Sequence, residues 1–268
     1  MATQKKVQVK VIGSVKNQNN GCTVLQGMCI SNGGKLYCAK INKDDSICCI
    51  VKKEKYTDKD YTVKEYNSSV LGHANDFAYY NNHIYITKLT ETNKNATKNK
   101  VVKMTVDGDI VSTISLTNPN VPISAITHYK NGQFLIKTAG TSNCSSTTYS
   151  LVSVSGNTFK VLKKITIKNP LYNKGYNIRQ GIHYYNGKFY NIISKKNEKT
   201  DSISDNVLLV TDLKTIADGK MYSPSQLLTI SSTTEKLYEV ESISNSKDGK
   251  IIVGMNISSG DKICEVLI

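Results

Sequence analysis

The feature that most constrains the fold is a hairpin pattern that the chain repeats five times. Each copy reads as a short strand of alternating apolar residues, a turn carrying Asn, Asp or Gly, and a second alternating strand. Asn-Gly and Asp-Gly between such strands are strong signals of a β-hairpin. The five copies are QGMCISNGGKLYCAKI from Gln26, NDFAYYNNHIYITKL from Asn75, SAITHYKNGQFLIKT from Ser124, QGIHYYNGKFYNII from Gln180 and ESISNSKDGKIIVGM from Glu241. The repeat therefore predicts an all-β protein with almost no helix.

Each of the first four copies is followed by two more candidate strands, which makes about four strands per repeat of roughly 50 residues. This arrangement is typical of a β-propeller. The fifth copy has only a third strand, Ile263–Ile268, before the chain ends, and Lys6–Ile12 is an unassigned strand at the start. We therefore expect a single domain over residues 1–268. It would be a five-bladed propeller with blades beginning near residues 26, 75, 124, 180 and 241, and with residues 6–12 closing the last blade. A two-domain all-β protein is the alternative.

Composition limits the compartment and the partners. The 268 residues carry a formal net charge of +14, which favours anionic polymers or surfaces as partners.

The seven cysteines show no zinc-like spacing, and we expect them to be reduced. No apolar segment is long enough for a transmembrane helix. No leader is visible, so we expect a cytoplasmic protein, or an extracellular or cell-surface one if a leader has been trimmed. The pattern predicts a monomer.

Polar residues introduce the first strand of every repeat, at what would be one mouth of the propeller channel. Five such strands share an axis, so residues from distant parts of the sequence would converge there. Amide, hydroxyl, carboxylate and guanidinium groups of this kind suit sugars and other small polar ligands. They would equally suit a structural ring of hydrogen bonds between blades. The predicted site residues are Gln26, His73, Asn75, Asp76, Ser124, Arg179, Gln180, Glu239 and Glu241.

Catalysis would need the acidic members of this set. Asp76 and Glu241 could form the carboxylate pair of a glycoside hydrolase, with His73 orienting the substrate. His128 and His183 occupy matching positions before the Asn-Gly turns and could join His73 around a metal, although we expect no metal and no cofactor. No phosphate-binding loop, nucleophile elbow or nucleic-acid-binding module is recognisable, so no specific nucleic-acid partner is expected.

A resemblance covers nearly the whole chain. The QG…NG…Y pattern, GHANDF and RQGIHYYNGKFY resemble uncharacterised five-bladed β-propeller proteins of low-GC Gram-positive bacteria and their phages. They look more distantly like the helveticin-type group of extracellular proteins. Because such families include surface and wall-associated proteins, the resemblance implies a glycan or wall-polymer partner.

Three functions follow from these observations. The sequence favours a binding module whose channel mouth recognises a glycan or an anionic cell-wall-type polymer. The alternatives are a glycoside hydrolase-like enzyme using Asp76 and Glu241, and an interaction scaffold whose channel is purely structural.

Overall fold

The computed structural model describes residues 2–89, 99–118, 120–138, 145–196, 203–231, 238–257 and 260–268. Strands dominate these ranges, as the sequence predicts. The helical elements described are the four-residue α1 (Ser68–Leu71) and the 3-10 turn η1 (Tyr172–Lys174). Residues 211–218, whose composition is compatible with one short helical turn, are strand at Thr211 and Asp212 and loop or turn at 213–218. No helix in the described ranges has the length and apolarity needed to cross a bilayer.

The strands form successive antiparallel runs of four, called units 1 to 5 below. Unit 1 comprises β2 (Val24–Ile30), β3 (Leu36–Ile41), β4 (Ile47–Lys53) and β5 (Thr62–Asn67); unit 2, β6 (Phe77–Tyr80), β7 (His83–Thr87), β8 (Lys100–Thr105) and β9 (Ile110–Leu116); unit 3, β10 (Ile123–Lys130), β11 (Gln133–Thr138), β12 (Ser146–Ser155) and β13 (Thr158–Lys168). Unit 4 comprises β14 (Tyr176–Tyr185), β15 (Lys188–Lys196), β16 (Ile203–Asp212) and β18 (Gln226–Ser231); unit 5, β19 (Tyr238–Asn245), β20 (Ile251–Ile257), β21 (Asp261–Leu267) and β1 (Thr3–Val15). The two-residue β17 (Met221–Tyr222) pairs with β13.

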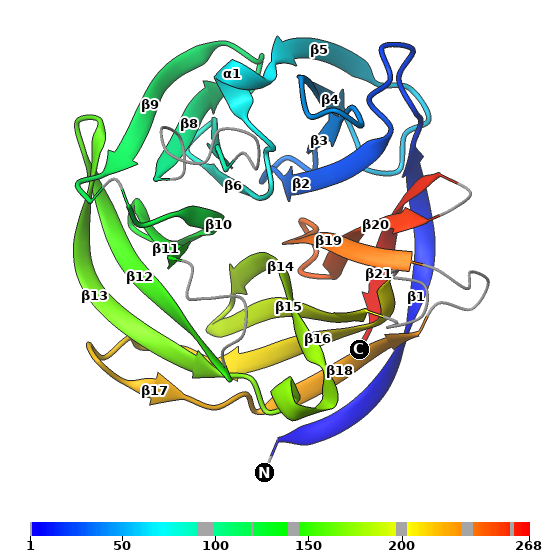
Figure 1. Cartoon of the computed structure of the whole chain (residues 1–268). Helices are drawn as coiled ribbons and strands as arrows, with labels where there is room; N and C mark the ends of the chain where they lie inside the picture. The colour runs from blue at the N-terminus through cyan, green and yellow to red at the C-terminus, as the bar shows by residue number, and fades with distance from the viewer. Residues whose placement is uncertain are drawn as a thin grey trace.

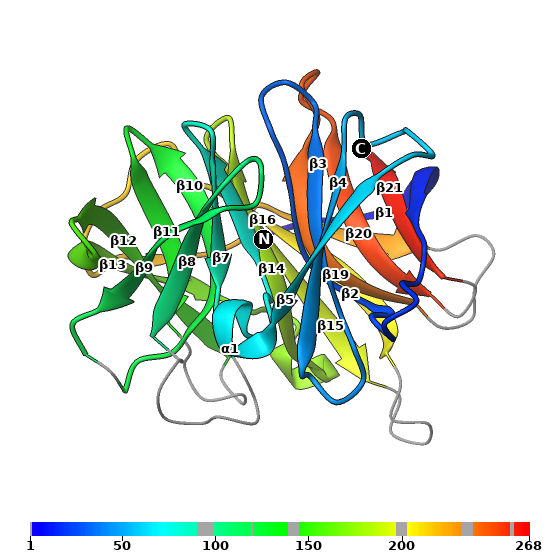
Figure 2. The ribbon, with the colours of Figure 1, turned by 90° about the horizontal axis from the view of Figure 1, so that it is seen from above.

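Parallel pairs at the outer edges join some of these units into larger sheets. β18 pairs with β1 and β13 pairs with β9, which gives an 8-stranded sheet, a 9-stranded sheet and the separate 4-stranded sheet of unit 1. The units nevertheless lie around a common centre, with the first strand of each on the inside (Figure 1). Seen from the side, these strands run from one face of the molecule to the other (Figure 2).

The inner hairpins have the turns that their sequences demand. Asn131 and Gly132 have φ of 52° and 69°, and Asn186 and Gly187 have φ of 47° and 76°. Positive φ at both central residues is the geometry whose twist matches antiparallel strands, and Asn and Gly tolerate it best. The Asn-Gly signals therefore identified these hairpins correctly.

An apolar core lies between each pair of neighbouring units. Separate buried clusters join unit 1 to 2, 2 to 3, 3 to 4 and 4 to 5, and one more joins unit 5 back to unit 1. In that last cluster Ile252 and Ile263 pack with Leu25 and Met28. The inner strands also contact one another in the same cyclic order, with β19 touching β2. The first and last parts of the chain are thus packed together.

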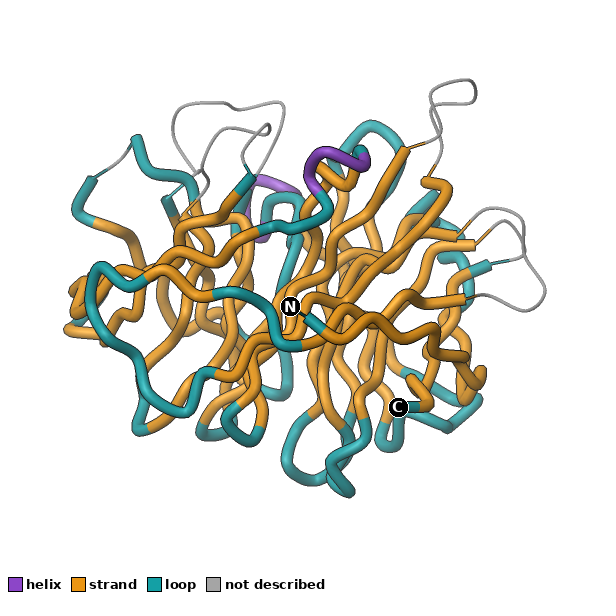
Figure 3. Tube along the Cα trace, turned by 90° about the horizontal axis from the view of Figure 1, so that it is seen from below, coloured by secondary structure: helices purple, strands orange, loops and turns teal. Residues whose placement is uncertain are grey.

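The N-terminal strand makes the pairing that the sequence predicted. β1 runs antiparallel to β21, from Gln8 opposite Leu267 to Val15 opposite Asp261. Its first half, Thr3–Gln8, runs parallel to β18. The N-terminal strand therefore lies along the outside of the molecule, with its first half beside β18 and its second half beside the C-terminal strand β21 (Figures 1 and 3).

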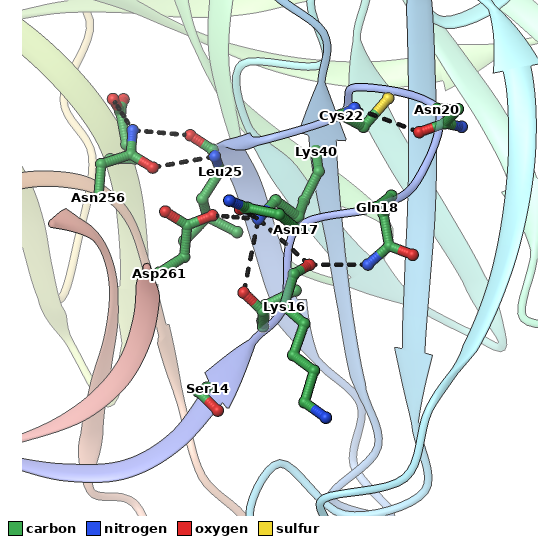
Figure 4. Close-up of polar contacts among 12 residues, drawn as sticks. Ser14, Lys16, Asn17, Gln18, Asn20, Cys22, Leu25, Lys40, Asn256 and Asp261 are labelled. Atoms are coloured by element: carbon green, nitrogen blue, oxygen red, sulfur yellow. Dashed lines mark hydrogen bonds and ion pairs between the residues drawn. The ribbon is translucent and has the colours of Figure 1, made fainter. Parts of the chain in front are cut away.

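Two buried lysines of unit 1 hold the end of β1. The Lys40 ammonium lies 2.6 Å from the Asp261 carboxylate and donates to the carbonyls of Val15 and Lys16 and to the Asn17 side chain (Figure 4). The Lys53 ammonium donates to the carbonyl of Ser14. The closing strand is therefore attached to unit 1 by charge-assisted hydrogen bonds as well as to unit 5 by strand pairing.

Candidate functional site

Asp76, the most prominent predicted site residue, joins three units through backbone hydrogen bonds. It precedes β6 in unit 2 and is completely buried. Its Oδ2 accepts from the amides of Ile126 (3.0 Å) and Ile182 (3.2 Å), in the inner strands of units 3 and 4. Its Oδ1 accepts from the Phe77 amide at 3.1 Å. Burial raises the pKa of Asp76 to about 7, although these amides and the Lys137 charge oppose the shift. Both oxygens of the carboxylate are thus used in hydrogen bonds that hold the inner strands of three units together.

Lys137 of β11 is a buried cation whose charge acts on the Asp76 carboxylate. Its ammonium donates to the carbonyls of Arg179 and Gln180, both at 3.2 Å. Burial lowers the pKa of Lys137 to about 8, and the Asp76 charge works in the opposite direction. Lys137 therefore fixes the start of β14 by binding its backbone.

Glu241 of β19 is also buried and bonded within the protein. Its Oε1 accepts from the Asn256 amide at 2.8 Å, and the same amide group of Asn256 bonds the backbone of Leu25 in unit 1 (Figure 4). Burial and the neighbouring Glu239 carboxyl raise the pKa of Glu241 well above its usual range. Gln180 donates to Glu239 Oε1 at 2.6 Å. These contacts connect units 4, 5 and 1.

The structure brings Asp76 close to the segment around Glu241. A Cβ atom at Gly181 would lie 3.0 Å from the Glu241 carbonyl and 3.2 Å from Asp76 Oδ1. A Cβ atom at Gly27 would lie 2.7 Å from the Ala74 carbonyl. The glycine of each Gln-Gly pair therefore allows close approach of inner strands at the centre, which explains why that dipeptide recurs at the strand starts.

The remaining predicted residues divide between this centre and the periphery. Gln26 is buried on β2, and Arg179 donates to the Ser146 carbonyl at 3.2 Å. Asn75 Oδ1 and Ser124 Oγ are buried without a hydrogen-bond partner among the described residues. His73 instead pairs with Asp45, between β3 and β4, at 3.0 Å. The prediction that these residues form one ligand site stays a prediction.

A cavity lies where the inner strands end, away from the strand starts that the sequence analysis selected. Its volume is about 410 Å³, and every inner strand (β2, β6, β10, β14 and β19) contributes to it. Its polar and aromatic lining comprises Ser31, Asn32, Tyr79, Thr127, His128, Tyr129, His183, Tyr184, Tyr185, Asn186, Ser244, Asn245, Ser246 and Lys247. We call this space the strand-end cavity. None of its lining residues is Asp or Glu.

The lining of the strand-end cavity is partly fixed by contacts between units. Ser244 Oγ accepts from the Ile30 amide, and Thr127 Oγ1 accepts from the Tyr184 amide, both at 3.0 Å. His183 Nε2 lies 2.8 Å from Asn245 Oδ1. Burial lowers the pKa of His128, and it lowers the pKa of His183 to about 4, so both imidazoles are neutral near pH 7.

Two residues that line the strand-end cavity, His128 and His183, were already conspicuous in the sequence. Both stand just before the turns of the inner hairpins, where their matching positions suggest a metal shared with His73. The structure places His128 and His183 in the cavity, while His73 pairs with Asp45. The described residues contain no cluster of three side chains suited to a metal.

Among known proteins, only comparison by structure finds similar ones. No protein-family model matches the sequence, and no curated protein matches it. Solved structures do. The α-L-arabinofuranosidase from Lactobacillus brevis has a TM-score of 0.57 and 9% identity over 92% of each chain.

Two fungal enzymes are similar to the same degree. The α-L-arabinofuranosidase from Podospora anserina has a TM-score of 0.57 and 8% identity, over 100% of this chain and 98% of that one. The exo-β-1,3-galactanase from Phanerochaete chrysosporium has a TM-score of 0.59 and 11% identity, over 97% of this chain and 64% of that one. At such identities the likeness extends to the fold alone.

Proposed function

We propose that the protein is a glycan-binding module built on a closed five-bladed propeller, and that it holds its ligand in the strand-end cavity. The ring is supported by apolar clusters at all the unit junctions, including that between units 5 and 1. In this interpretation each unit is one blade, and the outer parallel pairs β18–β1 and β13–β9 are contacts between blade edges.

The observation that carries the proposal is the chemistry of the strand-end cavity. Tyrosine rings there stand beside hydroxyl, amide and imidazole groups, contributed by all the inner strands. A sugar ring has apolar faces and a rim of hydroxyls, so it needs this mixture of apolar surface and a few placed polar groups. The fold neighbours named as arabinofuranosidases and a galactanase add that this fold serves proteins acting on glycans.

Binding without cleavage fits the positions of the carboxylates. Glycosidases need two carboxyl groups flanking the scissile bond, roughly 5 to 9.5 Å apart. The lining of the strand-end cavity has none, and Asp76 and Glu241 are bonded to the backbone or to Asn256. One observation favours a hydrolase at the strand starts: the raised pKa of Glu241 is what a general acid requires.

The test combines binding and turnover on one glycan panel. We expect arabinose- or galactose-containing oligosaccharides to bind with no release of reducing ends. Tyr79→Ala and Tyr185→Ala, in the strand-end cavity, should weaken binding at least tenfold. Tyr222→Ala, at the outer edge of unit 3, is the matched control and should bind as the parent does. Turnover by the parent protein that is abolished in folded Asp76→Asn and Glu241→Gln variants would favour the hydrolase instead.

A further inference from the structure

The two histidines of the strand-end cavity are held in fixed orientations by neighbours that differ in kind. His183 lies on β14 and is bonded to Asn245 of β19, whereas His128 lies on β10 between aromatic rings. The neighbours of each imidazole determine which of its ring nitrogens is free to bond a ligand.

The tautomer of His183 follows from its partner. Asn245 Nδ2 donates to the Ser246 carbonyl at 2.8 Å, which leaves Asn245 Oδ1 facing His183 Nε2. Because that oxygen can only accept, His183 must donate from Nε2. A neutral imidazole that donates from Nε2 carries its lone pair on Nδ1. His183 therefore offers a hydrogen-bond acceptor at Nδ1.

His128 has a ring nitrogen that no described residue bonds. Its ring stacks on Tyr80, with centroids 4.4 Å apart and an interplanar angle of 20°, and Phe134 meets it edge-on at 5.7 Å. Its Nε2 is buried and has no hydrogen-bond partner among the described residues. A buried polar atom left unpaired is costly, and a hydroxyl group that bonded to Nε2 would remove this cost.

The rest of the cavity lining offers little to balance a charged ligand. It contains no Asp or Glu, and its one lysine, Lys247, is exposed at the rim. A charged group deep in such a cavity would meet no buried counter-charge among these lining residues, which is costly. A hydroxyl group both donates and accepts, so it can pair with His183 Nδ1 and with His128 Nε2 in either tautomer.

We infer that the strand-end cavity takes an uncharged sugar ring, whose hydroxyls pair with the neutral imidazoles of His128 and His183. This inference rests on the proposed glycan-binding function. It separates recognition of the sugar ring from the net charge of +14, which would attract acidic polymers without selecting a ring.

The experiment compares matched neutral and acidic oligosaccharides, such as galactose and galacturonic acid oligomers of equal length, at 50 and 500 mM NaCl. At 500 mM NaCl, we expect the neutral oligomer to bind at least ten times more tightly than the acidic oligomer. The Kd of the neutral oligomer should change less than twofold between 50 and 500 mM NaCl. Screening should remove binding that depends on exterior lysines.

Two variants keep the fold while removing the ligand contact. His128→Phe preserves stacking on Tyr80 but has no ring nitrogen. His183→Gln has an amide that can still donate to Asn245 but loses the Nδ1 acceptor. Each should weaken binding of the neutral oligomer at least tenfold at pH 7 without lowering the melting temperature at that pH. His83→Gln is the control, since His83 lies outside the cavity lining and bonds the Asn81 carbonyl.

The outcomes separate this inference from the proposed function. Tighter binding of the acidic oligomer, or parent-like binding by His128→Phe and His183→Gln, would overturn the inference while leaving a glycan-binding module. Failure of both oligomers and of the wider panel to bind would overturn the two together.

Discussion

At the scale of single residues, side chains that bond a neighbouring backbone join one unit to the next. Asp76 of unit 2 accepts from Ile126 and Ile182, and Asn206 of unit 4 accepts from the Val240 amide of unit 5 at 3.1 Å. Inner strands of different units are not paired in sheets, so their buried amides need such partners. Asp76, just before β6, and Asn206, within β16, serve this purpose.

Replacing Asp76 with Asn should destabilise the fold. The Asn side chain would turn an amide N–H₂ toward backbone N–H groups, and each amide left unsatisfied costs about 1–3 kcal/mol. Denaturant unfolding measures the loss. Asp109→Asn is the control, because Asp109 is exposed and pairs only with the exposed Lys64. An Asp76→Asn variant as stable as the parent would contradict the structural role.

His183 should make the protein acid-labile in one pH window. Its pKa is about 4 in the folded chain and about 6.5 when exposed, so the unfolded chain binds a proton that the folded chain refuses. Stability from this group is present above pH 6.5 and is lost as the pH falls toward 4. Asp76 acts oppositely, since its raised pKa of about 7 adds stability as the pH falls.

The variant His183→Gln isolates the histidine contribution, because it leaves Asp76 in place. The melting temperature of His183→Gln minus that of the parent protein should increase as the pH is lowered from 7 to 4.5. A constant difference between the two proteins across that range would show that His183 keeps its ordinary pKa when folded.

At the scale of elements, β1 is the strand whose attachment closes the chain on itself. It pairs with β18 and β21, and its end is held by Lys40 and Lys53. Without it, the edges of β18 and β21 would lie open, which invites pairing with other chains.

Lys40→Met should loosen this closure. Removing one partner of a buried ion pair typically costs about 3–5 kcal/mol, because the other charge is left uncompensated. Here that charge is Asp261, and three oxygen acceptors also lose their donor. Calorimetric unfolding and amide exchange of β1 measure the effect. Lys35→Met, which removes an exposed pair with Glu54, should change stability by about 1 kcal/mol or less.

Elements made by local rules could be predicted from the sequence. The hairpins are examples, because Asn-Gly turns and alternating residues act over a few positions. The pairing of the closing strand followed instead from the repeat, whose last copy lacks a fourth strand. The role of Asp76 could not be predicted, since its partners lie 50 and 106 residues away. The strand-end cavity was missed because a Tyr or His before a turn has the same local sequence whether it packs in the core or lines a cavity.

At the scale of the whole molecule, the two ends of the inner strands differ in chemistry. The strand starts bury carboxylates that bond the protein itself, whereas the strand ends surround a cavity with aromatic and uncharged polar groups. The central claim is that ligand binding belongs to the strand ends and that the strand starts hold the ring together.

Isothermal titration of the parent protein with neutral arabino- and galacto-oligosaccharides in 500 mM NaCl tests this claim most directly, with reducing ends assayed in the same cell. The account predicts saturable binding at one site per chain, no cleavage, and loss of the heat signal in His128→Phe. Cleavage of the oligosaccharide, or binding that survives His128→Phe but disappears in a folded Glu241→Gln variant, would contradict it.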